Sequence, residues 1–109
     1  MITWADFEKI DIRTGTITAV HDFPEARKPA LKLIIDFGEL GTRQSSAQIT
    51  TFYNKENLVG QQIVAVINFP PKIIAGFKSE CLVLGIYNEN GNVVLLQPSM
   101  QVKNGCKIG

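Results

Sequence analysis

Residues 68–84, a segment rich in backbone breakers, join two apolar stretches in the second half of the chain. Pro70 and Pro71 lack a backbone N–H donor, so strand pairing must stop at these residues. Gly76 permits a backbone conformation that other residues rarely adopt. Polar connections of defined conformation on a strand-rich scaffold often carry binding function. We therefore expect this connection to contribute to a binding site.

Strand signals dominate the rest of the sequence. Residues 31–37 follow a period-two pattern, and residues 62–69 and 82–87 are strongly apolar. Residues 10–23 predict one long strand, in which the apolar parity changes after Gly15 as it does at a β-bulge. A strand that bends in this way can contribute to both halves of a curled sheet, which is typical of a barrel.

Turns and short helices are expected between these strands. Asn-Gly at residues 90–91 predicts a β-hairpin. Residues 3–6 resemble a capped helix start, and residues 50–58 suit a second short helix that ends before Gly60. Residues 42–48 are polar and compatible with a further strand. Five or six strands without a long helical pattern predict an all-β fold, a small closed or partly open barrel.

Composition indicates one folded domain over residues 1–109. Apolar residues make up 45% of the chain, enough for a core, and the 11 basic and 10 acidic residues give a net charge of +1. A dedicated non-specific nucleic-acid binder usually carries a clear basic excess. The longest wholly apolar run, residues 63–67, is far shorter than the ~20 residues that span a bilayer. We therefore expect a soluble, cytoplasmic protein without membrane insertion.

Side chains suited to catalysis or metal binding are sparse. His21 is the one histidine, and Cys81 and Cys106 lie too far apart for a metal-ligand motif. Carboxylates are scattered singly, and the sequence contains no nucleotide-binding glycine motif. These observations predict no enzyme activity, no metal and no cofactor. For the cysteines, two free thiols are favoured, with a single disulfide as the alternative.

Four motifs carry a family resemblance through their order and spacing. They are residues 11–17 (DIRTGTI), 43–49 (RQSSAQI), 58–60 (LVG) and 68–79 (NFPPKIIAGFKS). In this respect nearly the whole chain resembles the tRNA-binding domain family, an OB-fold found alone and appended to some aminoacyl-tRNA synthetases. The resemblance implies a five-stranded OB-fold β-barrel with short helices. It also implies tRNA binding as the role of the wider family.

Within that family, the sequence is most similar to a small stand-alone bacterial member described as an export-related chaperone. The likeness lies in residues 23–27, 44–50 and 68–80. It implies a homodimer of OB-fold protomers that binds unfolded or precursor polypeptides, with structure-specific tRNA binding as the alternative. Glu80 departs from the tRNA-binding members, because it adds a negative charge where an RNA backbone would pass. Like-charge apposition costs affinity, which favours a polypeptide ligand.

The candidate ligand site combines polar and positively charged side chains with apolar ones. An apolar floor with polar rims suits an unfolded polypeptide, whereas RNA requires stacking aromatics and paired positive charge. For Arg13, a ligand contact and an ion pair with Asp11 both stay open. For Lys32 and the serines, the alternative is an ordinary solvent-facing strand. The residues expected to bind peptide or tRNA are Arg13, Lys32, Ser45, Ser46, Gln48, Asn68, Lys72, Ile74, Phe77, Lys78 and Ser79.

Apolar residues near both ends of the chain are candidates for a dimer interface, because they need burial somewhere. These are Trp4, Phe7, Val102 and Ile108. The near-zero net charge gives little protection against self-association. A homodimer would carry two binding faces, which raises the apparent affinity for a long chain through effective concentration.

Overall fold

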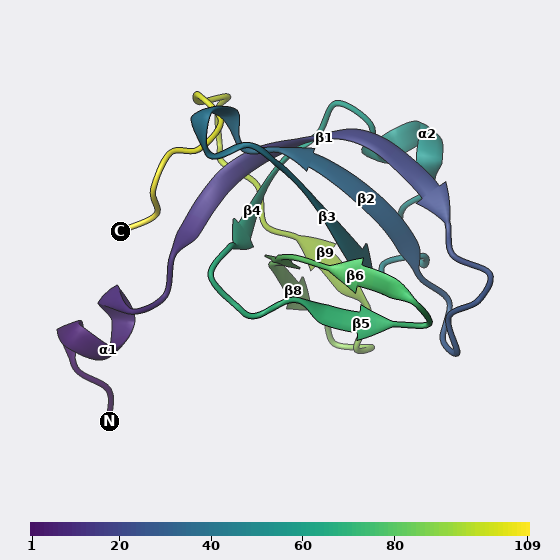
Figure 1. Cartoon of the computed structure of the whole chain (residues 1–109), viewed down its shortest axis with the longest axis horizontal. Helices are drawn as coiled ribbons and strands as arrows, with labels where there is room; N and C mark the ends of the chain where they lie inside the picture. The colour runs from purple at the N-terminus through teal and green to yellow at the C-terminus, as the bar shows by residue number, and fades with distance from the viewer.

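A five-stranded antiparallel sheet, curled into a nearly closed barrel, forms the centre of the molecule (Figure 1). The computed structural model describes all 109 residues. The strand order in the sheet is β3-β2-β1-β4-β7. The all-β, five-stranded OB-fold expected from the sequence is therefore confirmed. The strands are β1 (Ile12–Asp22), β2 (Leu31–Asp36), β3 (Thr42–Ala47), β4 (Gln62–Val66) and β7 (Leu82–Val83).

Smaller elements surround the barrel. Two separate two-stranded hairpins, β5–β6 and β8–β9, follow β4 and β7. The helical elements are α1 (Trp4–Glu8), η1 (Gly38–Leu40) and α2 (Lys55–Leu58). No helix is both long and apolar enough to cross a membrane. The hairpin strands are β5 (Lys72–Ile74), β6 (Phe77–Ser79), β8 (Gly85–Tyr87) and β9 (Val93–Leu95).

The two ends of the sheet, β3 and β7, are joined by hydrogen bonds that close the barrel. Glu80 N donates to Gln44 O at 2.8 Å, and Ser45 Oγ donates to Cys81 O at 2.8 Å. Glu80 and Cys81, which form these bonds with β3, directly precede β7 in the sequence. The barrel interior is filled by 13 buried residues, which come from β1, β2, β4 and β9, from α2 and from the connections between strands. Closure satisfies part of the β3 edge that would otherwise be open to other strands.

Strand β1 bends at a β-bulge that lies later than the sequence predicts. The register with β2 shifts between Ile17 and Ala19, which places the bulge at Thr18. Pairing with β4 is regular through Gly15, so the prediction of a bulge at Gly15 was wrong. Gly15 has a steric role instead. A Cβ atom at this position would lie 2.7 Å from a side-chain methyl of Ile35, inside van der Waals contact.

The C-terminal segment covers the outer side of β1. Thr14 Oγ1 donates to Lys103 O at 3.0 Å, and Thr16 Oγ1 donates to Asn104 Oδ1 at 2.8 Å. Gln62 Nε2 donates to the same Asn104 oxygen at 3.0 Å. The side chains of Thr14 and Thr16 are thus occupied by the tail, while Gly15 faces the core. Both sides of β1 are covered, which explains why alternation alone misplaced the bend.

Both short helices form where the sequence predicts them, and the first begins at the predicted cap. Thr3 caps α1 in a reciprocal capping box with Asp6. Asn54 and Asn57 form the same arrangement at the start of α2, inside the expected 50–58 segment. Each box satisfies backbone N–H groups that a helix start leaves unpaired. The Asn90-Gly91 turn also joins two strands, β8 and β9, as predicted.

Candidate functional site

The β5–β6 hairpin lies beside the edge of β3 (Figure 1). Gln44 Nε2 donates to Lys78 O at 2.8 Å, and Ser46 N donates to Ser79 Oγ at 3.1 Å. Gln44 N donates to Glu80 Oε1 at 3.1 Å. Side-chain oxygens thus take the place of strand carbonyls along this edge. The connection at residues 68–84, predicted to contribute to a binding site, therefore contains a hairpin that is hydrogen-bonded to β3.

A lysine and two phenylalanines meet where the hairpin crosses the barrel. The Nζ atom of Lys32 lies 4.7 Å from the ring centroid of Phe23 and 5.2 Å from that of Phe77. The two rings pack edge to face, with centroids 5.4 Å apart. Lys32 is therefore half-buried over aromatic faces, where the ring quadrupole attracts its charge. It is not an ordinary solvated strand lysine.

Phe23 is the member of this cluster that sequence reasoning missed. It is buried, with 4% of its surface exposed, and follows the last residue of β1. In the sequence it reads only as the apolar end of a strand. Its two partners come from β2 and from the hairpin, so only the fold brings them together.

The outer surface of the hairpin mixes apolar and positively charged side chains. Lys72 and Lys78 are exposed, and Ile74 is half-buried. Ile73 is 64% exposed and the adjacent Phe69 is 55% exposed. Such a surface offers apolar contact area together with charges that hold phosphate or carboxylate groups. Gln48, just past the end of β3, is exposed as well.

Ser45 is not accessible to a ligand, contrary to the sequence-based expectation. It is 1% exposed, and its hydroxyl donates to Cys81 O across the barrel closure. Its neighbour Ser46 is half-buried, and its N–H is taken by Ser79. The hydroxyls of this strand alternate between the two faces, so only one of them points outward.

Cys81 is a buried thiol at the same seam. Burial raises its pKa to about 11, and the hydrogen bond from Ser45 and the charge of Arg43 oppose that rise only in part. Both Cys81 and Cys106 are free, and Cys106 is exposed. A buried thiol with a raised pKa is unreactive, so Cys81 serves packing. No three His, Cys, Asp or Glu side chains converge as metal ligands do.

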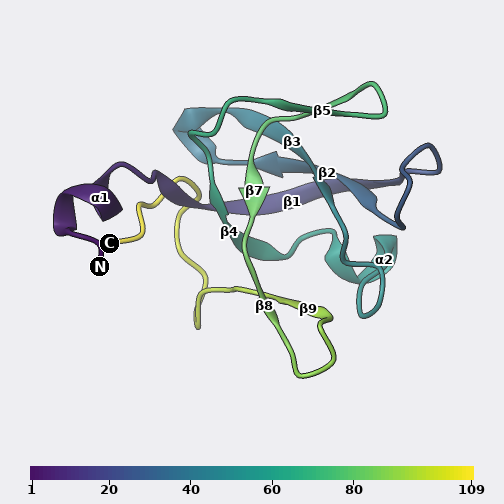
Figure 2. The same cartoon turned by 90° about the horizontal axis from the view of Figure 1, so that it is seen from below.

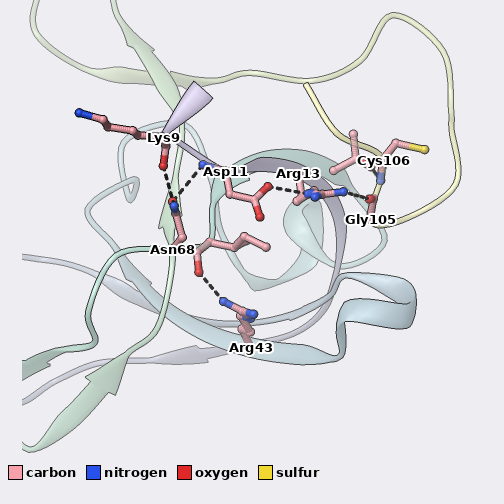
Figure 3. Close-up of polar contacts among 9 residues, drawn as sticks. Lys9, Asp11, Arg13, Arg43, Asn68, Gly105 and Cys106 are labelled. Atoms are coloured by element: carbon pink, nitrogen blue, oxygen red, sulfur yellow. Dashed lines mark hydrogen bonds and ion pairs between the residues drawn. The ribbon is translucent and has the colours of Figure 1, made fainter. Parts of the chain in front are cut away.

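Arg13 forms the ion pair that the sequence left as one of two options. Its Nε lies 2.6 Å from Asp11 Oδ1, and its Nη1 donates to Gly105 O at 3.2 Å (Figure 3). Asn68 likewise has a bracing role. Its side chain donates to Lys9 O at 2.7 Å and accepts from Asp11 N at 3.0 Å. Both residues tie the start of β1 to neighbouring segments.

An apolar groove lies between α1 and the C-terminus. It has a cavity volume of about 700 Å³ and is lined by Ile2, Thr3, Trp4, Phe7 and Gly109. Figure 1 and Figure 2 place the two termini on the same side of the molecule as α1, and Figure 1 shows α1 between them. The groove brings together two of the four residues expected at a dimer interface. Val102 and Ile108 do not line it, and the Val102 backbone is bonded to Gln62 instead.

Two solved chaperone structures are similar to this chain over its full length. The chaperone CsaA from Bacillus anthracis str. Ames is 62% identical, with a TM-score of 0.95, and covers 100% of this chain and 99% of its own. The CsaA chaperone protein from Picrophilus torridus is 55% identical, with a TM-score of 0.94 and 100% coverage of both chains. The similarity to a chaperone predicted from the sequence is confirmed at this level.

Curated relatives include the methionine–tRNA ligase of Methanocaldococcus jannaschii. It is 36% identical over 101 residues, which are 93% of this chain but 15% of the ligase. The chain thus spans about 15% of the length of the curated relatives it matches. The model of the putative tRNA binding domain matches residues 12–107. With nearly the whole length matched, the chain belongs to the tRNA-binding domain family.

Proposed function

We propose that this chain is a CsaA-like, export-related chaperone that binds unfolded or precursor polypeptides. It acts in the cytoplasm as a homodimer of single-domain protomers and catalyses no reaction. The observation that carries the proposal is the 62% identity to a CsaA chaperone over the full chain. The proposal treats the β5–β6 hairpin and the neighbouring edge of β3 as the ligand surface.

The composition of that surface supports a polypeptide ligand. Ile73 and Phe69 expose apolar area, which stabilises a bound segment without requiring a particular sequence. Gln48, Ser46 and Lys78 provide polar groups at its margin. No nucleotide-binding glycine motif is present, so the proposed activity is independent of ATP.

Suppression of client aggregation tests this function. A chemically denatured client diluted into buffer should scatter less light when this protein is present in stoichiometric excess. Ile73→Ser should weaken the suppression, because it removes exposed apolar area from the hairpin. Phe52→Ser is the matched control, since Phe52 is 47% exposed but lies between β3 and α2. Unchanged client scattering with the wild-type protein would reject the chaperone proposal.

The groove beside α1 supports the homodimer. Trp4 is 82% exposed and lies with Phe7 along an apolar cavity at the termini. Large exposed aromatic residues in one groove are typical of surfaces that a partner covers. Sedimentation should therefore give twice the 12.0 kDa chain mass at micromolar concentration. Trp4→Ala should shift the mass toward the monomer, and a wild-type monomer would contradict the dimer.

Binding of tRNA is the second candidate function, favoured by the family match. Lys32, Lys72 and Lys78 lie on or beside the hairpin and supply positive charge for phosphates. Glu80 opposes RNA binding less than its charge suggests. Its carboxylate accepts a hydrogen bond from Gln44 N, so it is part of the barrel seam.

The salt dependence of tRNA affinity separates the two functions. Each neutralised phosphate contributes a slope of roughly −0.7 to −0.9 to the logarithm of affinity against the logarithm of salt. Replacing both Lys72 and Lys78 with alanine should flatten the slope by about 2 if each contacts a phosphate. Lys55→Ala is the control, because Lys55 lies on α2 and is paired with Asp22 at the end of β1. Undetectable tRNA binding at low salt would remove this candidate.

A further inference from the structure

Phe23 is buried outside the main core. It is 4% exposed, yet it does not belong to the 13-residue cluster that fills the barrel. The ring centroid of Phe23 lies 5.4 Å from that of Phe77 and 4.7 Å from the Nζ atom of Lys32. Phe23 is thus a buried aromatic residue outside the barrel cluster that contacts both the hairpin and Lys32. We call the surface formed by Phe23 and Lys32 the aromatic seat.

The occupant of the aromatic seat, Phe77, is carried on a separable element. The β5–β6 hairpin is a two-stranded sheet of its own and pairs with no strand of the barrel sheet. Isolated two-stranded hairpins are only marginally stable. Its turn holds Ala75 at φ 47°, a left-handed conformation that costs energy for a residue with a side chain. Pro70 and Pro71 uncouple its first strand from β4.

Between its own strands and β3 the hairpin makes two polar contacts, and the backbone bond from Glu80 N to Gln44 O, just past its end, anchors its base to the barrel. One backbone carbonyl, Lys78 O, accepts from a side chain, and one side-chain oxygen, Ser79 Oγ, accepts from a backbone N–H. Water or the backbone of an extended peptide offers the same donors and acceptors. Phe77 provides the aromatic contact between the hairpin and the barrel, through Phe23 and Lys32.

We propose that the β5–β6 hairpin is a flap whose Phe77 occupies a site for aromatic side chains. When the flap lifts, an aromatic residue of an extended polypeptide takes the place of Phe77 on the aromatic seat. The inference deepens the proposed polypeptide binding and rests on it for its biological role. It assigns the ligand class: segments that contain tryptophan, tyrosine or phenylalanine.

The chemistry of the seat distinguishes aromatic from aliphatic ligands. The ammonium group of Lys32 lies within 6 Å of both ring centroids, inside the range of a cation–π interaction. The edge-to-face packing of Phe77 on Phe23 adds a term that an aliphatic side chain does not reproduce. Tryptophan has the strongest cation–π attraction and should bind best.

A small probe tests the seat without any client protein. N-acetyl-tryptophanamide is titrated into the full chain while the ring resonances of Phe23 are followed by NMR. Phe77→Ala removes the competing ring, so the affinity should rise about ten-fold over wild type, because the site-competent fraction increases. Phe52→Ala should leave it unchanged. N-acetyl-leucinamide, the aliphatic counterpart, should bind more weakly to the Phe77→Ala variant.

A second pair of variants keeps the test decisive if Phe77→Ala fails to fold. Lys32→Met retains the apolar stem and should reduce the preference for the tryptophan probe over the leucine probe, because only the edge-to-face packing on Phe23 then remains. Cysteines at Ser46 and Ser79, introduced together in a Cys106→Ser background, should lock the flap to β3 on oxidation. The oxidised protein should bind the tryptophan probe less well than the same protein reduced.

The outcomes separate the flap from the chaperone function. The flap is overturned if the disulfide variant binds the tryptophan probe equally well when oxidised and when reduced. It is also overturned if Phe77→Ala shows no preference for the tryptophan probe over the leucine probe. Both results count even if client aggregation is suppressed. Probe binding at Phe23 without suppression of aggregation retains the flap and rejects the chaperone proposal. Weaker tryptophan binding to folded Phe77→Ala also overturns the inference, because Phe77 would then be a contact residue and not a competitor.

Discussion

Replacing Arg13 by methionine decides between a ligand-binding and a structural role for this residue. The change removes the guanidinium but retains much of the apolar stem. It deletes the 2.6 Å contact with Asp11 and the 3.2 Å hydrogen bond to Gly105 O. It also leaves the Asp11 carboxylate without its partner. A structural role therefore predicts a loss of stability with little change in ligand affinity.

The expected loss follows from the exposure of the pair. Hydrogen bonds to charged groups contribute roughly 1.5–3 kcal/mol each when buried. The side chains of Arg13 and Asp11 are 24% and 33% exposed, so solvent screening reduces this contribution. With the second bond to Gly105 O, we expect a loss of about 2 kcal/mol. For a chain of this size, that corresponds to a fall in Tm of about 8 °C.

Urea unfolding followed by far-UV circular dichroism measures this loss at fixed protein concentration, because a dimer makes stability concentration-dependent. Arg27→Met is the matched control, since Arg27 is exposed and forms no ion pair. Its stability should stay within about 0.5 kcal/mol of wild type. The structural reasoning is refuted if Arg13→Met unfolds like the wild type yet no longer suppresses aggregation or binds tRNA.

Three further predictions concern the scaffold. Gly15→Ala should lower the free energy of unfolding by about 1–3 kcal/mol in urea titrations, because its Cβ would lie 2.7 Å from Ile35. Asn68→Ala should cost about 1 kcal/mol and speed amide exchange at Asp11, which loses its acceptor. The pKa of Cys81, about 11 when folded, exceeds its ordinary value of 9.0. Stability should therefore fall by about 1.4 kcal/mol per pH unit between these values, and this component should vanish in Cys81→Ala.

The barrel was predictable because its signals are local. Residues 31–37 alternate along one strand, and Asn90-Gly91 sits between two short apolar runs. The position of the bend in β1 could not be predicted from the sequence, because the outer side of this strand is covered by a segment from the far end of the chain. Hydrophobic periodicity reports whether a side chain is buried, but not which neighbour buries it. Thr18 therefore carries the bulge that was assigned to Gly15.

The fold brings some of the residues expected to bind a ligand together and buries one of them. Lys32 and Phe77 were both expected at the ligand surface, and the fold brings them together. Phe23 completes the cluster, and its role depends on contacts that no local pattern encodes. Ser45 was expected at the same surface but points into the barrel seam. In a polar strand without strong alternation, the sequence does not reveal which hydroxyl faces inward.

The groove lined by residues from both chain ends limits how the protein can be handled in experiments. Ile2 and Gly109 line the same groove, so an affinity tag at either end would emerge beside Trp4. If the proposed homodimer forms through this groove, a tag there would compete with the partner chain and shift the measured mass toward the single chain. The turn at Asn90-Gly91 is an exposed alternative. A short epitope inserted at that turn would label the molecule while leaving both chain ends free.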